Sequence, residues 1–373
     1  MSKKGRVLMA MSGGIDSSVA AVLLHEQGYE VVGMTMKTWD YASAGGSKKE
    51  TGCCSLDSIN DARGIAVEKG FPHYIIDIRE EFGNHVINDF VDEYLAGRTP
   101  NPCVKCNTHI KWEALLKRAD MLDCEFIATG HYANVREENG RFVVSKGKDE
   151  WKDQSYVLWG VTQECLSRTM FPVGNYHKAE IRQMAVDMGF HELAQKNESY
   201  EICFIPDNDY RSFLKRRVDG IEEKLDGGQF ISVDGKVLGR HRGYPFYTIG
   251  QRKGLEIAVG DPLYVIDIQP DKNIVVLGSF DDLKRQEMWV KSTNFIKLPA
   301  LDKTIEALTR IRYKDPGTFS TLEQIGDHVK VSFHKPVSAV APGQSAVFYD
   351  GNDVIGGGFI AKHAPHEINT LVS

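Results

Sequence analysis

Hydrophobic and polar positions follow two alternating periods along the first third of the chain. Short apolar runs that predict buried strands lie at 6–11, 30–36, 73–78 and 125–128. Segments with apolar residues at helical spacing lie between and after them, at 16–27, 57–69, 80–95 and 109–121. This regular alternation predicts an α/β fold in which helices cover both faces of a parallel sheet.

Beyond about residue 205 the pattern changes to short strand-like runs separated by Asp-Gly and Pro-Gly turns. These runs are 264–268, 274–277, 304–311, 329–333 and 345–349. They predict an all-β region that ends in a small barrel. Boundaries near 205 and 282 therefore predict three domains, at 1–205, 206–282 and 283–373.

Composition narrows the class of protein. Of 373 residues, 42% are hydrophobic and 26% charged, as in a soluble globular protein. The sequence shows no apolar run of about 18 residues and no signal peptide, so we expect a cytoplasmic protein without a membrane anchor. Seven cysteines in that compartment indicate catalysis, metal binding or burial. The net charge of −6 means that any nucleic acid must bind to local basic patches.

Residues 9–18, Met-Ala-Met-Ser-Gly-Gly-Ile-Asp-Ser-Ser, join the first predicted strand to the first predicted helix. Glycines let the backbone approach a polyphosphate, and the free N–H groups of a helix start attract its charge. Asp16 is suited to hold Mg²⁺ against the phosphates. An isolated Gly-Gly is often only a turn, but this one lies where open parallel sheets bind ligands. Because no lysine follows the glycines, this is not a Walker A loop. It resembles the PP-loop of ATP pyrophosphatases, which activate a carbonyl by adenylation.

Two cysteine segments distinguish the reactions of that superfamily. In the first, residues 97–107, two prolines stiffen a predicted loop that leads into a helix capped by Asn107 or Thr108. A helix start and nearby lysines favour the thiolate of Cys106, so we interpret it as a nucleophile. The second segment, 199–206, surrounds Cys203 with apolar residues and alone fits a buried structural cysteine equally well.

Taken together, these segments resemble the bacterial tRNA-specific 2-thiouridylase family along nearly the whole chain. The matching segments include the Ser-Gly-Gly-Ile-Asp-Ser loop, 52–55, 98–102, 129–133, 152–156, 201–205, 248–255, 310–313 and 341–344. The resemblance implies that ATP adenylates O2 of the wobble uridine in the lysine, glutamate and glutamine tRNAs. A Cys203 persulfide would then deliver sulfur, and Cys106 would complete the reaction through a Cys106–Cys203 disulfide. The sulfur would come from a cysteine desulfurase or a relay carrier, and a monomer would suffice.

The resemblance also implies binding residues. ATP would contact Ala10, Met11, Ser12, Gly13, Gly14, Ile15, Asp16, Ser17, Met36 and Gly130. The target base would contact Asn101, Pro102 and Cys103, and tRNA would contact His131, Lys152, Asp153, Gln154, Arg312, Tyr313 and Gln344. Other interpretations remain open, with Met36 in the core, His131 structural and 152–154 a solvated turn.

One position departs from the family. Several members carry Asp where this chain has Cys103, so an acid–base role cannot be transferred. Cys103 would instead be a spare resolving thiol, or would join Cys106 and Cys203 around a metal or iron–sulfur cluster. We assign no role to Cys53 and Cys54. Two further alternatives are a PP-loop synthetase acting on a small molecule and a non-catalytic tRNA-binding protein.

Overall fold

The computed structural model describes residues 4–39, 55–196, 202–205, 207–257 and 260–365. They form two compact units that each contain several stretches of the chain. Unit 1 comprises Met1–Val86, Cys103–Asp209 and Asn352–Val354, and unit 2 comprises Ile87–Pro102, Tyr210–Gly351 and Ile355–Ser373. Over the described ranges, no helix is both long enough and apolar enough to span a bilayer. The predicted division into three domains stays a prediction.

Unit 1 is built on a parallel sheet whose strand order is β3-β2-β1-β4-β7. Its strands are β1 (Arg6–Ala10), β2 (Glu30–Lys37), β3 (His73–Asp77), β4 (Phe126–Ala128) and β7 (Thr169–Met170). All four pairings are parallel. This is expected where helices connect the strands, because a parallel pair needs a long crossover connection. The predicted α/β class is confirmed for this part of the chain.

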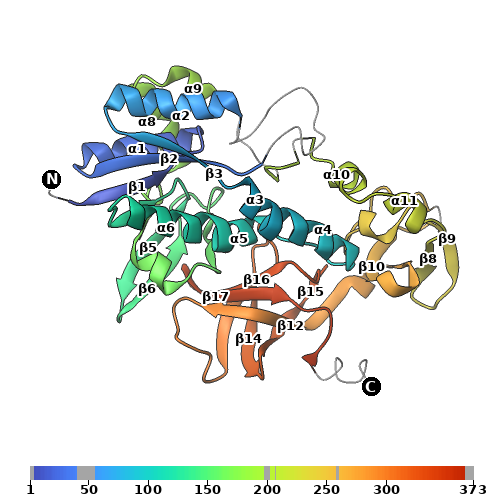
Figure 1. Ribbon diagram of the computed structural model, residues 1–373. Coiled ribbons are helices and arrows are strands. Elements are labelled where there is room, and N and C mark those ends of the chain that lie inside the picture. Colours follow the sequence, from blue (N-terminus) through green and yellow to red (C-terminus); the bar gives the residue numbers. More distant parts are fainter. Residues whose placement is uncertain (1–3, 40–54, 197–201, 206, 258–259, 366–373) are drawn as a thin grey trace. The chain divides into compact units, whose positions relative to one another are not determined.

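Helices cover both faces of this sheet. Those that contact it are α1 (Ile15–Glu26), α2 (Leu56–Lys69) and α6 (Glu113–Met121). Helix α8 (Lys178–Asp187) packs on α1, α9 (His191–Gln195) packs on α8, and α7 (Gln163–Ser167) packs on strand β6 (Arg141–Lys146). Figure 1 shows α1 and α2 on the side of the sheet opposite α6. The predicted limits of α1 and α2 are confirmed to within one residue. Ser55 caps α2 by accepting from Ser58 N, and Gly70 ends it at φ 78°.

The helices before and after the first cysteine segment differ from their predicted form. The predicted helix 80–95 consists of α3 (Arg79–Phe82), a π-helical turn (Gly83–Ile87) and α4 (Asn88–Leu95). The helix predicted to begin at residue 109 begins seven residues earlier. It contains α5 (Pro102–Lys105) and a π-helical segment (Cys106–Trp112), which continues into α6.

The prediction of a loop at Cys106 is therefore wrong, as is that of a cap at Asn107 or Thr108. Proline is favoured in the first helical turn because its missing N–H is not needed there, so Pro102 starts the helix. Asn107 lies inside the helix and donates to Val157 O at 2.9 Å.

Unit 1 also contains a hairpin that the strand pattern did not predict. Strands β5 (Ala133–Glu138) and β6 (Arg141–Lys146) pair around Asn139 and Gly140, both at positive φ. Asn-Gly is the favoured pair for such a two-residue turn, so the signal was present in the sequence.

Unit 2 combines a small mixed sheet with a closed barrel. The sheet has the order β10-β11-β8-β9 and contains β8 (Gln229–Ser232), β9 (Val237–Arg240), β10 (Tyr264–Gln269) and β11 (Ile274–Gly278). Two short helices precede it, α10 (Tyr210–Arg217) and α11 (Ile221–Lys224).

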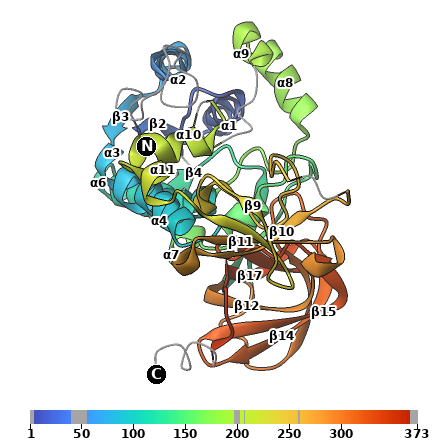
Figure 2. The ribbon, with the colours of Figure 1, turned by 90° about the vertical axis from the view of Figure 1, so that its right-hand side faces the viewer.

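The barrel has six antiparallel strands and closes where β12 pairs with β17. Its strands are β12 (Lys284–Phe295), β13 (Ile305–Arg310), β14 (Thr318–Ile325), β15 (His328–Ser338), β16 (Ser345–Asp350) and β17 (Asp353–Ile360). Figure 2 shows several of these strands in orange and red. The predicted barrel and three of its strands are confirmed. Strand β12 escaped prediction because its first four residues are exposed and polar or charged.

Candidate nucleotide and sulfur-transfer site

The predicted nucleotide loop lies at the carboxyl end of β1, which pairs with β2 on one side and β4 on the other. This is the position where an open parallel sheet binds ligands. Ser17 Oγ accepts from Ser12 N at 3.1 Å and donates to Gly14 O at 3.0 Å. Gly14 is the N-cap of α1 and has no side chain to cap it, which leaves the N–H groups of the first turn for an anion.

Two glycines bring this loop into close contact with its neighbours. Gly13 has φ 71°, and a Cβ placed on it would lie 2.0 Å from Ser58 O. A Cβ on Gly130 would lie 2.7 Å from Ser17 N. Any larger side chain at Gly130 would therefore displace the loop, and the predicted contact of Gly130 with ATP stays a prediction.

The two methionines assigned to the ATP site differ in their surroundings. Met11 is buried, its N–H donates to Met34 O, and its carbonyl accepts from Thr35 Oγ1 at 2.8 Å. Met36 is half-buried near the carboxyl end of β2. Met11 therefore fixes the start of the loop, while Met36 keeps surface that an adenine ring can cover.

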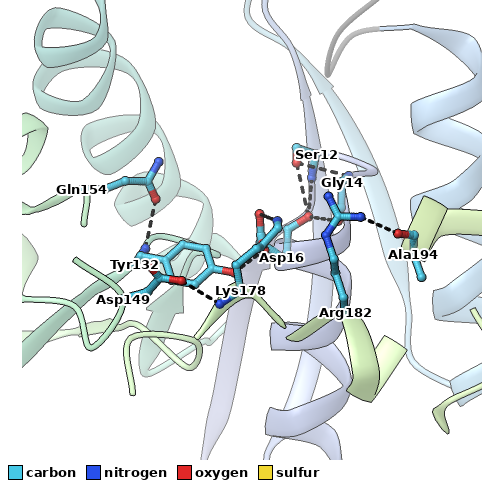
Figure 3. A network of polar contacts seen from close by, with 10 residues as sticks. Ser12, Gly14, Asp16, Tyr132, Asp149, Gln154, Lys178, Arg182 and Ala194 are labelled. Atoms are coloured by element: carbon cyan, nitrogen blue, oxygen red, sulfur yellow. Dashed lines mark hydrogen bonds and ion pairs between the residues drawn. The ribbon is translucent and has the colours of Figure 1, made fainter. Parts of the chain in front are cut away.

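Asp16, in the first turn of α1, lies at the centre of a polar network that sequence reasoning missed (Figure 3). Lys178 Nζ lies 2.7 Å from Asp16 Oδ1 and 2.8 Å from Oδ2. Tyr132 Oη donates to Asp16 Oδ1 at 2.6 Å. The Lys178 side chain is 10% exposed and that of Asp16 30% exposed, so this ion pair is shielded more than a surface pair. A buried cation thus lies beside the lysine-free loop.

Lys178 reaches the loop because α8 begins at this residue. The backbone N–H of Lys178 donates to Asp149 Oδ2 at 2.9 Å, and His177 and Glu180 form a capping box. Arg182, one turn further along, donates to Ala194 O at 2.7 Å. No spacing rule connects Lys178 with a carboxylate 162 positions away.

The cysteines of the first segment lie in different environments. Cys103 is the second residue of α5 and is exposed, whereas Cys106 is buried. The residue near the helix start is therefore Cys103, and Cys106 lies one turn inside the helix.

Cys203 lies in a turn and not in a strand. Ile205 N donates to Ile202 O across this turn at 2.9 Å, and Cys203 is half-buried. The next residue, Phe204, packs edge-on against Phe82 of α3, with ring centroids 5.8 Å apart. Helix α3 also contacts the π-helical segment that begins at Cys106. Both predicted catalytic cysteines therefore lie on segments that pack around the same helix.

Cys53 and Cys54 lie outside the described residues. Within the part of the chain that the structure describes, no three or more His, Cys, Asp or Glu side chains are grouped to hold a metal ion.

His131 is buried beside the loop that carries Gly130. Its Nδ1 lies 2.7 Å from Thr129 Oγ1, and its ring packs against Trp112 and Phe171. Burial, with a smaller effect of Lys111, lowers the pKa of His131 well below its usual value of 6.5. The imidazole is therefore neutral, and any contact with RNA would be a neutral hydrogen bond.

Side-chain hydrogen bonds stabilise the turn that contains residues 152–154. Asp153 is buried and accepts from Gly147 N and from the N–H and Oγ of Ser155. Gln154 exchanges two hydrogen bonds with the backbone of Tyr132. In this segment, Asp153 and Gln154 thus shape the turn with their side chains, and Lys152 precedes them.

Unit 2 carries the other predicted contacts. Gln344 Nε2 donates to Pro100 O at 2.8 Å and to Thr99 O at 3.3 Å, and Thr99 N donates to Pro342 O. Asn101 Nδ2 lies 3.5 Å from Ser345 Oγ. The turn before β16 therefore fixes the segment that contains Asn101 and Pro102. Arg312 and Tyr313 are exposed just after β13.

Three family models match successive parts of the chain. Residues 5–207 match the family model described as the tRNA methyl transferase HUP domain, which covers more than half of the chain. The chain belongs to the tRNA-specific 2-thiouridylase family. Residues 211–279 match a PRC-barrel domain and residues 285–360 a β-barrel domain described for aminomethyltransferases. A parallel sheet, a central domain and a terminal barrel thus follow one another in this thiouridylase chain, as predicted.

The relatives are similar over almost their whole length. The tRNA-specific 2-thiouridylase of Cytophaga hutchinsonii is 67% identical over 96% of this chain and 98% of its own. That of Amoebophilus asiaticus is also 67% identical, over 96% of each chain. The enzyme of Salinibacter ruber is 58% identical over 96% of this chain and 95% of its own.

Proposed function

We propose that this thiouridylase-family chain is an ATP-dependent sulfurtransferase that replaces O2 of the wobble uridine of tRNA with sulfur. By resemblance, its substrates are the lysine, glutamate and glutamine tRNAs. The observation that carries the proposal is that Cys106 and Cys203 lie on segments packed around α3, in the unit that also contains the nucleotide loop. Family membership, with relatives named as thiouridylases, supports the same reaction.

The nucleotide loop would hold ATP for attack by the uridine. Backbone N–H groups from Gly13 to Ser17 and the serine hydroxyls would bind the phosphates. Asp16 is a hard oxygen ligand suited to Mg²⁺, which neutralises phosphate charge when bound. Lys178, now held by Asp16, would supply its ammonium to the α-phosphate region. The uridine O2 would displace pyrophosphate and form a C2–O–AMP bond, which converts O2 into a good leaving group.

Sulfur transfer would then use the two thiols in turn. The terminal sulfur of a Cys203 persulfide attacks C2, and AMP leaves with its oxygen. The Cys106 thiolate attacks Sγ of Cys203, which breaks the S–S bond and leaves the outer sulfur on C2 as the thiocarbonyl. The resulting Cys106–Cys203 disulfide needs a dithiol reductant before the next cycle. Alternatively, attack of Cys106 on the persulfide first releases sulfide, which then attacks C2.

Positioning of the RNA would use both units. A flipped-out uridine would contact Asn101, Pro102 and Cys103, because chemistry at C2 requires the base to leave its stack. Gln344 holds the segment before Asn101 in place through two backbone carbonyls. Arg312 and Tyr313 are exposed and would contact phosphate and base faces. A cysteine desulfurase or a relay carrier would load Cys203, and a cytoplasmic monomer would suffice.

The test is thiolation of a wobble-uridine tRNA transcript with ATP, Mg²⁺, a desulfurase and cysteine, on a gel that retards sulfur-bearing RNA. We expect the retarded band to disappear in Cys106→Ser and Cys203→Ser. It should persist in Cys103→Ser and in the control Cys124→Ser, a buried free thiol before β4. Both inactive variants should still release pyrophosphate in a single turnover, because adenylation precedes sulfur transfer.

Three results would change the proposal. Thiolation by Cys203→Ser would remove the persulfide role. Loss of the band in all three variants, Cys103→Ser included, would require a three-cysteine mechanism. Failure of the wild type with a competent sulfur donor would indicate another PP-loop reaction, such as one on a small molecule.

A further inference from the structure

Trp151 is the most exposed large hydrophobic residue among those that the structure describes. It is 94% exposed, whereas Trp39, Trp112 and Trp159 are each at most 3% exposed. Tryptophan is usually buried over most of its surface, because its large apolar ring is favourably removed from water. A tryptophan ring that is almost fully in water is therefore unusual, and its flat face is open to a stacking partner.

Hydrogen bonds fix the backbone on both sides of Trp151 and keep its side chain exposed. Asp149 Oδ1 accepts from Trp151 N at 3.1 Å, and its Oδ2 accepts from Lys178 N at 2.9 Å. Lys152 N donates to Asp149 O at 3.0 Å. On the far side, buried Asp153 closes the turn onto Gly147 N at 3.2 Å. The polar bonds on both sides of Trp151 present its ring outward on a defined turn.

The turn also connects the ring with the nucleotide site. Asp149 holds the first residue of α8, Lys178, whose ammonium meets Asp16 (Figure 3). Gln154, three residues after Trp151, bonds to the backbone of Tyr132, whose hydroxyl also meets Asp16. The exposed ring therefore belongs to the same hydrogen-bonded framework as the residues proposed to hold ATP.

The charges around Trp151 are mixed. Lys152 follows it and is half-buried, Glu150 precedes it and is exposed, and Lys148 pairs with Glu180 of α8. Because positive and negative side chains are balanced here, charge attraction alone would not bind RNA to this turn. A flat, uncharged ring instead suits stacking, which every nucleobase face allows.

We propose that Trp151 is a stacking platform for an unpaired base of the tRNA substrate, with the Lys152 ammonium at the neighbouring phosphate. The proposal rests on the proposed function as a tRNA sulfurtransferase. The indole face covers the base and removes both apolar surfaces from water. Because Asp149 in the same turn bonds to Lys178 N, the bound base would be held at a fixed position relative to α8. Trp151 is thus a substrate-binding residue outside the group that contacts the reacting atoms.

The experiment measures equilibrium binding of an unmodified lysine tRNA transcript by filter retention, without ATP or sulfur donor. Trp151→Ala should weaken binding about 5- to 150-fold, as expected for one lost base–aromatic stack worth about 1–3 kcal/mol. Trp151→Phe should recover most of the affinity, because it restores an aromatic face. The matched control is Phe319→Ala, which removes a 62% exposed aromatic ring from β14 and should leave binding unchanged.

Salt dependence separates stacking from charge. The slope of log K against log salt should be the same in Trp151→Ala and wild type, because a stack releases no counterion. In Lys152→Met the slope should fall by about 0.7–0.9, as for one lost phosphate contact. Unchanged tRNA affinity in Trp151→Ala would overturn the proposal.

Two further outcomes are distinguishable. If Trp151→Ala binds tRNA normally but requires more of the desulfurase or carrier for thiolation, the ring is a protein-docking residue and the stacking proposal is wrong. If the wild type itself neither retains tRNA on the filter nor thiolates it, the proposed function fails before the role of Trp151 is reached. The melting temperature of Trp151→Ala should equal that of the wild type, since the ring makes little contact within the protein.

Discussion

The nucleotide loop of unit 1 and the barrel of unit 2 place their functional residues by different means. In the loop, Ser12, Gly14 and Ser17 bond to one another within six consecutive positions, at a sheet edge set by the strand order. In unit 2, Gln344 fixes the carbonyls of Thr99 and Pro100 from more than 240 positions away. A local motif thus carries its own geometry, whereas the barrel provides a rigid support for a segment that has little structure of its own.

The largest effect should come from the ion pair beside the loop. Lys178→Met keeps the length and apolar stem of the side chain but removes its charge. If the ammonium stabilises the phosphates, the rate of pyrophosphate release should fall about 10²–10³-fold, as for other preorganised charges. The measurement is single-turnover release of pyrophosphate with saturating tRNA.

Unit 2 offers a matched control for this pair. Lys297 lies 2.7 Å from Asp350, the same distance as in the Lys178–Asp16 pair, but Asp350 is 66% exposed. Lys297→Met should leave the rate unchanged and alter stability by about 0–1 kcal/mol. Wild-type pyrophosphate release by Lys178→Met would show that this charge serves only to hold Asp16.

The next effect concerns the steric limit at Gly130. Gly130→Ala places a Cβ 2.7 Å from Ser17 N, so the loop must move and ATP affinity should fall. We expect at least a tenfold higher KM for ATP, equivalent to about 1.4 kcal/mol of lost binding. The control is Gly64→Ala on the exposed face of α2, where a Cβ meets nothing within 4 Å. That change should stabilise the protein by about 0.5–1 kcal/mol. An unchanged KM in Gly130→Ala would separate this glycine from the ATP site.

A smaller effect should follow from releasing the supported segment of unit 2. Gln344→Ala removes two hydrogen bonds to backbone carbonyls, each worth about 1 kcal/mol. The amides from Arg98 to Asn101 should then exchange hydrogen faster, and thiolation should slow while ATP affinity stays constant. Gln324→Ala is the matched control, because Gln324 also bonds to two carbonyls, those of Gly326 and His328, but within one hairpin. Equal amide protection in Gln344→Ala and wild type would contradict the supporting role.

The last effect is on stability and not on activity, and both units share it. Burial lowers the pKa of His131 in unit 1, and lowers that of His241 in unit 2 to about 4. The unfolded chain binds a proton at each histidine near pH 6.5, whereas the folded chain does not, so the free energy of unfolding falls as the pH drops below 6.5. Each histidine contributes up to about 1.4 kcal/mol per pH unit, down to about pH 4 for His241.

Urea unfolding at about pH 7 and about pH 5 tests this effect. His241→Gln should show a smaller loss between the two conditions than the wild type, although it is less stable at both. The control is His334→Gln, which changes an exposed histidine paired with Glu306 and should preserve most of the wild-type loss. An identical loss in His241→Gln and wild type would mean that this imidazole takes up its proton in the folded state.

The sequence predicted much of unit 1 because its signals are local. Apolar periodicity located α1 and α2 to within one residue, and the Ser-Gly-Gly loop was found at the correct sheet edge. Prediction failed where two local rules competed. Prolines at 100 and 102 were interpreted as stiffening a loop, but Pro102 is the first residue of α5, so Cys106 lies inside a helix. The polar outer face of β12 similarly hid a strand whose core residues are Met288 and Val290.

By itself, the sequence determined the alternation of strands and helices, the lysine-free nucleotide loop and the cysteines that indicate sulfur chemistry. The first two depend on residues within about twenty positions of one another, where backbone geometry fixes which side chains meet. The roles of Cys106 and Cys203 came from a resemblance along nearly the whole chain. Only the tertiary structure decided that Lys178 and Tyr132 hold Asp16, that Gln344 supports the segment before Asn101, and that Trp151 stays in water. Those contacts depend on which surfaces of distant elements pack together. Packing of the whole hydrophobic core determines that arrangement, and no short stretch of sequence does.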